Sequence, residues 1–110
     1  MDERRSAVRV AVRLPALYRS GSMTVRGWVA DLSRGGLFMR SHFLDRLGAE
    51  VEVGVEIGDE TVKAAGLVTR LHHGPRDRGM GISFRQLSRR EHRKLANFLI
   101  ERRYQALSLV

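Results

Sequence analysis

The sequence predicts an all-β fold, a six-stranded antiparallel β-barrel, followed by one C-terminal helix. Apolar residues recur at every second position through most of the first 86 residues, and short turn signals separate these runs. The segment after Ser88 contains neither Gly nor Pro until the end of the chain. A sheet of six short strands protects its edges by closing on itself. A chain of 110 residues without repeats has room for one core, so we expect one domain over residues 1–110.

The alternation of apolar and polar residues predicts where the strands lie. The first strand extends towards Tyr18, with Pro15 at an edge or bulge position. In the second strand, over residues 27–33, the alternation places Trp28 on the core face, and Asp31 and Ser33 together on the other face. Four further strands are expected over residues 37–39, 50–57, 61–72 and 78–84, with a hairpin turn at residues 58–59.

The C-terminal segment carries the signals of a helix that begins at Arg89 and ends near Leu107. Ser88 and Glu91 have the spacing of a capping box. Two apolar stripes follow at helical spacing, one formed by Leu95, Phe98 and Leu99, and the other by Ala96, Ile100, Tyr104 and Leu107. One stripe can pack on the barrel. The other predicts contact with a client protein or a homodimer formed through this helix.

The charge predicts an anionic partner. The net charge is +8, and the excess lies at both ends of the chain. Only Lys63 and Lys94 are lysines, so eighteen of the twenty basic residues are arginines, whose planar fork binds phosphates and the guanine edge with two hydrogen bonds. The absence of cysteine excludes thiol chemistry, and no run is apolar and long enough to cross a membrane or to act as a signal peptide. We therefore expect a cytoplasmic protein.

Two short motifs bring arginine and carboxylate chemistry into the strand pattern. Arg5 and Arg9 lie four residues apart near the start of the first strand, and Arg4 adjoins them. The second motif is the run Asp31-Leu32-Ser33-Arg34-Gly35-Gly36, in which a carboxylate and a hydroxyl precede two glycines. Taken alone, Arg5 and Arg9 also fit solvated surface charges, and Asp31 also fits a residue that caps the glycine turn.

The two motifs together fit a guanine nucleotide. Guanine presents two acceptors that an arginine fork satisfies, and N–H donors that need an acceptor such as the Asp31 carboxylate. A phosphodiester adds negative charge, which Arg4, Arg34 and the backbone N–H groups around Gly35 and Gly36 are suited to receive. A simple polyanion would not require Asp31.

The pair Arg5-x-x-x-Arg9 followed by Asp31-x-Ser33-x-x-Gly36 resembles the two-part signature of the PilZ domain, a family of bacterial cyclic di-GMP receptors. The resemblance implies a PilZ-like split barrel (residues 10–86), a flexible arginine-bearing arm (1–9) and a C-terminal helix (88–107). It also implies that Arg5 and Arg9 fold over the ligand and grip guanine and phosphate. Asp31 and Ser33 would bind from the barrel surface, and Gly36 would leave room for the ligand.

These observations predict a non-enzymatic receptor in signal transduction: it binds the second messenger cyclic di-GMP, orders its N-terminal arm and signals through protein–protein contacts. No catalytic residue, metal site or cofactor is expected, because the histidines (His42, His72, His73, His92) lack metal-ligand spacing with carboxylates. One alternative is a small basic barrel that binds RNA or single-stranded DNA. Such barrels display stacking aromatics, whereas the alternation assigns Trp28, Phe38 and Phe84 mostly to the core. The other alternative is a protein-interaction module of the same fold.

Overall fold

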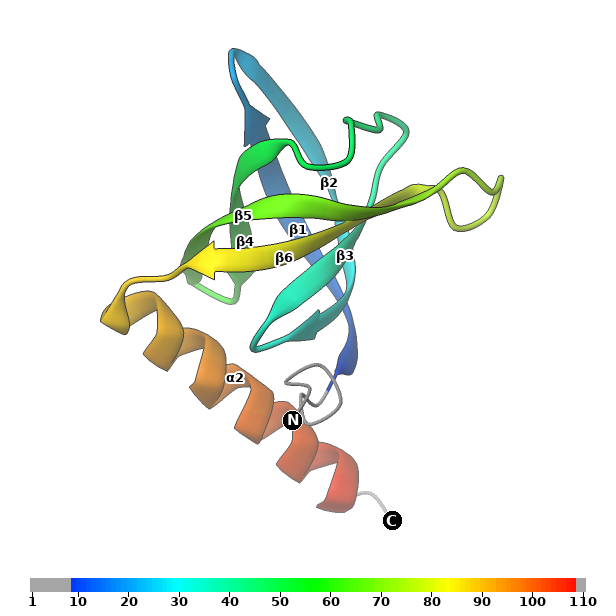
Figure 1. The fold of residues 1–110 in the computed structure, drawn as a ribbon. Helices are drawn as coiled ribbons and strands as arrows, with labels where there is room; N and C mark the ends of the chain where they lie inside the picture. The colour runs from blue at the N-terminus through cyan, green and yellow to red at the C-terminus, as the bar shows by residue number, and fades with distance from the viewer. Residues whose placement is uncertain (1–8, 109–110) are drawn as a thin grey trace, which may run out of the picture.

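The computed structural model describes residues 9–108, and their side chains through residue 102, as six strands followed by one helix (Figure 1). The elements are β1 (Val10–Ser20), β2 (Met23–Ser33), β3 (Gly36–Arg40), β4 (Glu50–Ile57), β5 (Glu60–His72), β6 (Gly79–Gln86) and α2 (Arg89–Ser108). The predicted strand ends differ from these by a few residues, and the second strand begins four residues earlier than predicted.

The six strands form a closed antiparallel barrel with the order β1-β2-β3-β6-β5-β4. Two meanders, β1-β2-β3 and β4-β5-β6, meet along β3 and β6 on one side and along β1 and β4 on the other. Closure pairs the outer strands that would otherwise expose unpaired backbone groups. The predicted fold class, an all-β barrel with a C-terminal helix, is confirmed.

Alternation is cleanest in β4 and β5, whose inward side chains fill the core. On β4 the valines are buried and the glutamates between them are exposed. Gly58 has a φ of 61°, which glycine adopts without strain, in the two-residue turn between these strands. The core also contains Tyr18, Met39, Met80 and Ile82 from the other strands.

Helix α2 runs across one end of the barrel and contributes to its core (Figure 1). The backbone N–H of Glu91 donates to the Ser88 hydroxyl over 3.2 Å, which confirms the predicted N-terminal cap. Leu95 is only 1% exposed, and Phe98 and Leu99 pack against the same core. The first predicted stripe is therefore the buried one, whereas Ile100 of the second stripe is 67% exposed.

The alternation predicted for β2 is wrong at Trp28. The register between β2 and β3 shifts between Val29 and Asp31, as it does where a strand carries an extra residue. Such a shift exchanges the two faces of a strand. Val29 is therefore fully buried and Leu32 is 1% exposed, whereas Trp28, expected in the core, is 47% exposed.

A buried tyrosine anchors the connection between β3 and β4. The Tyr18 hydroxyl donates a hydrogen bond to Oδ2 of Asp45 over 2.5 Å. Burial, and then this contact with the carboxylate, raises the pKa of Tyr18 well above its usual value. The same hydrogen bond lowers the pKa of Asp45, because it stabilises the ionised carboxylate.

Candidate cyclic dinucleotide site

The two sequence motifs meet on one wall of the barrel through an ion pair. Arg9 immediately precedes β1, and antiparallel pairing places Ala11 opposite Asp31 on β2. Nη1 of Arg9 donates to Oδ1 of Asp31 over 2.7 Å. The two side chains are 49% and 33% exposed, so both are accessible to solvent. Strand pairing therefore joins groups that lie 22 residues apart in the sequence.

Ser33 shapes the turn between β2 and β3. Ser33, predicted on the outer face beside Asp31, is only 3% exposed, because its hydroxyl turns into the β2–β3 turn and donates to the carbonyl of Gly36 over 3.3 Å. The same oxygen accepts from the N–H of Gly35 over 3.2 Å. The turn-capping role that the sequence also allowed for Asp31 thus falls to Ser33, while Asp31 binds Arg9.

The two glycines of the second motif differ in what surrounds them. A Cβ atom on Gly36 would lie 2.2 Å from the carbonyl oxygen of Ile82, so the close pairing of β3 with β6 requires glycine there. A Cβ atom on Gly35 would meet nothing within 4 Å. The carbonyl of Gly35 accepts a 2.8 Å hydrogen bond from the N–H of Phe84, which ties the turn to β6.

The structure gathers six of the eight expected site residues where β1 begins and β2 turns into β3. These are Arg9, Asp31, Ser33, Arg34, Gly35 and Gly36. Arg34 is exposed on the turn itself. The other two expected residues, Arg4 and Arg5, lie outside the described residues.

An arginine and an aromatic ring that the motifs did not include lie on the same wall. The guanidinium carbon of Arg13 lies 5.0 Å from the centroid of the Trp28 ring, in cation–π geometry. Sequence reasoning missed this pair because the strand alternation assigned Trp28 to the core. A signal existed for Arg13 alone, because its spacing of four from Arg9 places both on the same side of an extended segment.

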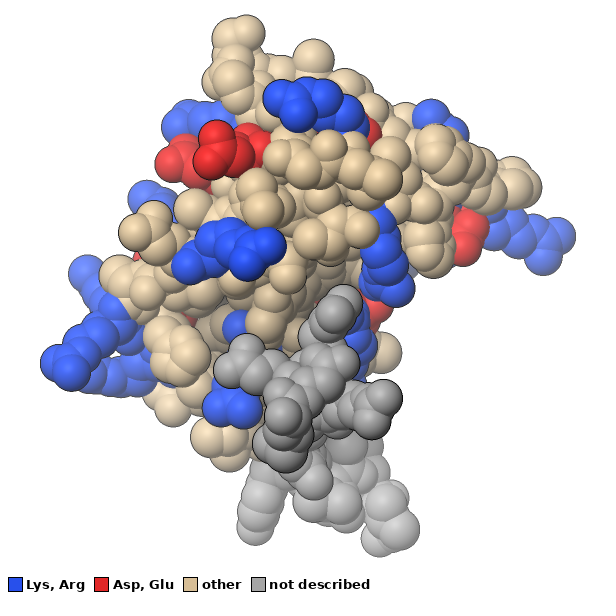
Figure 2. Space-filling model, in the orientation of Figure 1, with Lys and Arg blue, Asp and Glu red and all other residues tan. Residues whose placement is uncertain are grey.

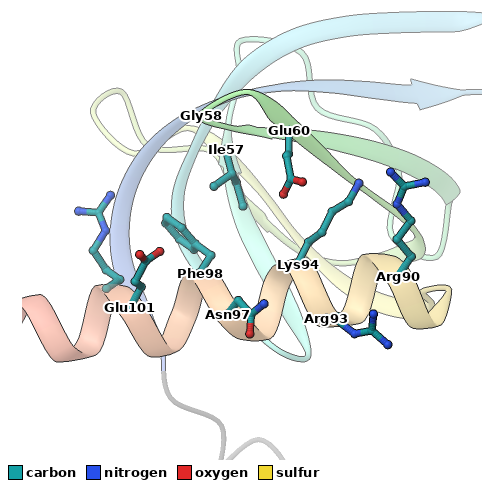
Figure 3. Close-up of a pocket in the computed structure, with 10 residues that line it drawn as sticks. Ile57, Gly58, Glu60, Arg90, Arg93, Lys94, Asn97, Phe98 and Glu101 are labelled. Atoms are coloured by element: carbon teal, nitrogen blue, oxygen red, sulfur yellow. The ribbon is translucent and has the colours of Figure 1, made fainter.

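A hollow lies between α2 and the β4–β5 turn, with a volume of about 750 Å³ (Figure 3). Phe98 and Lys94 point from the helix towards the hairpin, and Nζ of Lys94 donates to the carbonyl of Thr61 over 3.1 Å. The hollow shares no residue with the two motifs. Figure 2 shows basic side chains gathered over the first turns of α2.

Among the side chains that the structure describes, no three His, Asp or Glu residues lie close enough together to hold a metal ion. Within the described residues, no helix has the length and apolar character of a membrane span.

A family model for the PilZ domain matches residues 3–101, which include both motifs. The chain belongs to the PilZ family. The match confirms the resemblance that the arginine pair and the Asp-x-Ser-x-x-Gly run predicted.

Solved structures of other PilZ proteins share the fold of this PilZ domain. The Bacillus subtilis inhibitor of motility (MotI/DgrA) is 16% identical, with a TM-score of 0.78 over 92% of this chain and 52% of its own. Escherichia coli YcgR in complex with c-di-GMP is 17% identical, with a TM-score of 0.79 over 96% of this chain and 48% of its own. The PilZ domain of CeSA from a cellulose-synthesizing bacterium is 18% identical, with a TM-score of 0.67 over 86% of this chain and 96% of its own.

This PilZ domain therefore spans about half of the MotI and YcgR structures and nearly all of the isolated domain of CeSA. Among curated protein sequences, none matches it.

Proposed function

We propose that this PilZ domain is a receptor for cyclic di-GMP and that the Arg9–Asp31 wall is its ligand surface. The observation that carries the proposal is the 2.7 Å ion pair, which joins the arginine motif to the carboxylate motif at a solvent-accessible position. The family match over both motifs supports it. So does the likeness to two structures described as complexes with c-di-GMP, those of YcgR and of its PilZ domain.

The ion pair is weak enough for a guanine to replace it. An exposed salt bridge contributes about 0–1 kcal/mol, whereas one bidentate arginine–guanine contact contributes roughly 1–3 kcal/mol of discrimination. When the ligand binds, the Arg9 fork turns to the O6 and N7 acceptors or to a phosphate. The Asp31 carboxylate then accepts from the N1 and N2 hydrogens. The exchange replaces one ion pair with two sets of charge-assisted hydrogen bonds.

The remaining motif residues complete the proposed site. Arg5 grips guanine and phosphate together with Arg9, and Arg4 and Arg34 receive phosphate charge. Ser33 exchanges its contacts in the turn for one to the base or phosphate. The backbone at Gly35 lets the ligand approach closely, since a Cβ atom there would meet nothing within 4 Å, whereas the Cβ position of Gly36 faces the Ile82 carbonyl.

In this proposal the chain consists of an arm (residues 1–9), the barrel (10–86) and the helix (88–107). The arm becomes ordered over the bound ligand, and this change is the signal. Fixing the arm costs about 1–2 kcal/mol per residue in backbone entropy, which the charge-assisted contacts must exceed. A cytoplasmic client protein reads the changed surface, and no reaction is catalysed. The second apolar stripe of α2 is the surface proposed for a client or a homodimer; Ile100 is exposed there, and the side chains of Tyr104 and Leu107 lie outside the described residues.

A calorimetric titration with cyclic di-GMP tests the proposal. The wild type should bind, whereas Arg9→Ala and Asp31→Ala should each lose binding, with circular dichroism unchanged. Arg19→Ala and Glu52→Ala are matched controls, because they remove an exposed ion pair of 3.9 Å that also lies on the barrel wall. Wild-type protein that gives no heat at about 1 mM ligand overturns the proposed function. Normal binding by both site variants shows that the site lies elsewhere.

Binding of RNA or single-stranded DNA is the second candidate function, and the exposed ring of Trp28 is the observation that favours it. Proteins of that kind stack successive bases on a row of aromatic side chains. Among the described side chains, Phe38 is 7% exposed and Phe84 packs against the core, so Trp28 stands without such a row.

A further inference from the structure

Trp28 is a large aromatic side chain on the outer surface of the barrel. It is the one tryptophan in the chain. Its ring is 47% exposed, whereas the ring of Tyr18 is fully buried. Burial of such a ring would stabilise the fold by a few kcal/mol, so folding alone does not favour its position on the surface.

A strand irregularity turns Trp28 outward, towards Arg13, which the alternation of β1 already places on the outer face. The β2–β3 register shifts between Val29 and Asp31. The β1–β2 register shifts between Ala11 and Leu14, which brackets Arg13. The outcome is a guanidinium held 5.0 Å from the centre of an exposed indole ring. Bulges of this kind often redirect a side chain for a binding function.

The Arg13–Trp28 pair lies on the same wall as the Arg9–Asp31 pair. Arg9 and Arg13 are both exposed on the outer side of the first strand. Trp28 and Asp31 are three residues apart on β2, which corresponds to about 10 Å along a strand. The outer positions between the two pairs belong to small side chains, Ala11 and Ala30. The wall therefore presents two arginine-based pairs in tandem, with small side chains between them.

We propose that Trp28 and Arg13 form a stacking platform for the second guanine of cyclic di-GMP, an inference that rests on the proposed function. The ligand carries two guanines on one ring of two phosphates, and the Arg9–Asp31 pair accounts for only one of them. An indole face stacks on any base, and a guanidinium plane adds a cation–π contact. The platform supplies affinity, while Asp31 supplies the choice of guanine.

Fluorescence reports on the platform directly, because no other tryptophan contributes emission. We expect saturating cyclic di-GMP to change the emission of Trp28 in the wild type and in Arg19→Ala. The Asp31→Ala variant should show no change at the same ligand concentration. Wild-type binding that is visible by calorimetry but leaves the emission unchanged overturns the platform.

Calorimetry measures the contribution of the ring. We expect Trp28→Ala to weaken cyclic di-GMP binding by about tenfold or more, since one base stack supplies that much affinity. Trp28→Phe keeps a stacking face and should stay within about threefold of the wild type. Leu17→Ala is the matched control, because it removes another apolar side chain of the barrel wall that is 44% exposed. Its affinity should equal that of the wild type.

The outcomes separate this inference from the proposed function. Suppose that the wild type binds, that Arg9→Ala and Asp31→Ala lose binding, and that the affinity of Trp28→Ala stays within about twofold of the wild type. The stacking platform is then wrong, whereas the proposed receptor function stands. If the wild type gives no heat at about 1 mM ligand, both fall. Circular dichroism and the melting temperature establish that Trp28→Ala is folded, which its exposed position favours.

Discussion

Gly36 and Ser33 each have a structural role that precedes any ligand. The backbone of Gly36 packs against the Ile82 carbonyl, and Ser33 holds the turn through two hydrogen bonds. Substitution of either residue therefore alters folding as well as any binding. Arg9 and Asp31 are partly exposed and contact each other, so substitutions there test binding with little effect on the core.

Gly36→Ala should destabilise the barrel, and Gly35→Ala should not. A Cβ atom at Gly36 would lie 2.2 Å from backbone that β6 holds in place, whereas at Gly35 it would meet open space and the φ angle is not positive. We expect a loss of about 1–3 kcal/mol in the free energy of unfolding for Gly36→Ala and a change within about 0.5 kcal/mol for Gly35→Ala. Urea denaturation measures both. Equal stability of the two variants contradicts the steric role of Gly36.

The Tyr18–Asp45 hydrogen bond should make stability depend on pH below about 4. The pKa of Asp45 is lowered in the folded state, so the unfolded state binds more protons there. Its contribution is present above the ordinary pKa and is lost as the pH falls through the folded pKa. Tyr18→Phe should cost about 1–2 kcal/mol at neutral pH and less in acid. Denaturant unfolding at two pH values measures this, and a pH-independent cost contradicts it.

At the residue scale, the sequence predicted which charged side chains lie together better than it predicted which side chains are exposed. The meeting of Arg9 with a carboxylate on the second strand is observed, because Arg9 directly precedes β1, and β1 pairs with the strand that carries Asp31. The exposure of Trp28 was not predictable from alternation. An extra residue in a strand is specified by its partners in space, and nothing in the local pattern of residues 27–33 shows it.

Among the elements, the ones with strict periodicity or with caps were the most predictable. The β4–β5 hairpin follows from alternating valines and a Gly-Asp turn, and α2 follows from its Ser88 cap. Strand β2 was less predictable, since its register shifts near the end, so that alternation continued through the shift misplaces Trp28. Elements therefore become harder to predict where tertiary pairing overrides local pattern.

Lys94 should hold α2 on the barrel. Its ammonium donates to the Thr61 carbonyl on β5 and lies 3.3 Å from Glu91, with only 17% and 13% of the two side chains exposed. Lys94→Met removes both contacts and leaves a largely buried carboxylate without its partner, at a cost of about 1–3 kcal/mol in the free energy of unfolding.

Lys63→Met is the matched control for Lys94, because Lys63 is the other lysine and is exposed on β5. It should change stability by less than about 0.5 kcal/mol. Thermal melting of the two variants measures the difference. Identical melting temperatures contradict the proposed anchoring of the helix.

For the whole molecule, closure was predictable and strand order was not. Six short strands must cover their edges, which indicates a barrel. Four of the six neighbouring pairs join strands consecutive in sequence, as short turns imply. The pairs β3–β6 and β1–β4 join distant segments, and no local signal selects them. One long-range contact that favours the β3–β6 pair is the close packing of Gly36 against β6.

The net charge of +8 allows both candidate ligand classes, and the dependence of binding on salt separates them. A polynucleotide contacts many phosphates, so raising salt from about 50 to 200 mM should weaken its binding by about 1,000-fold or more. Cyclic di-GMP has two phosphates, and stacking and base-edge hydrogen bonds release few counterions. We expect its affinity to fall by no more than about tenfold over that range. Fluorescence titrations at several salt concentrations measure the slope. If the affinity for cyclic di-GMP falls steeply with salt, base contacts do not supply most of the affinity. If the protein binds single-stranded RNA or DNA tightly and salt-dependently but does not bind cyclic di-GMP, the nucleic-acid alternative is favoured.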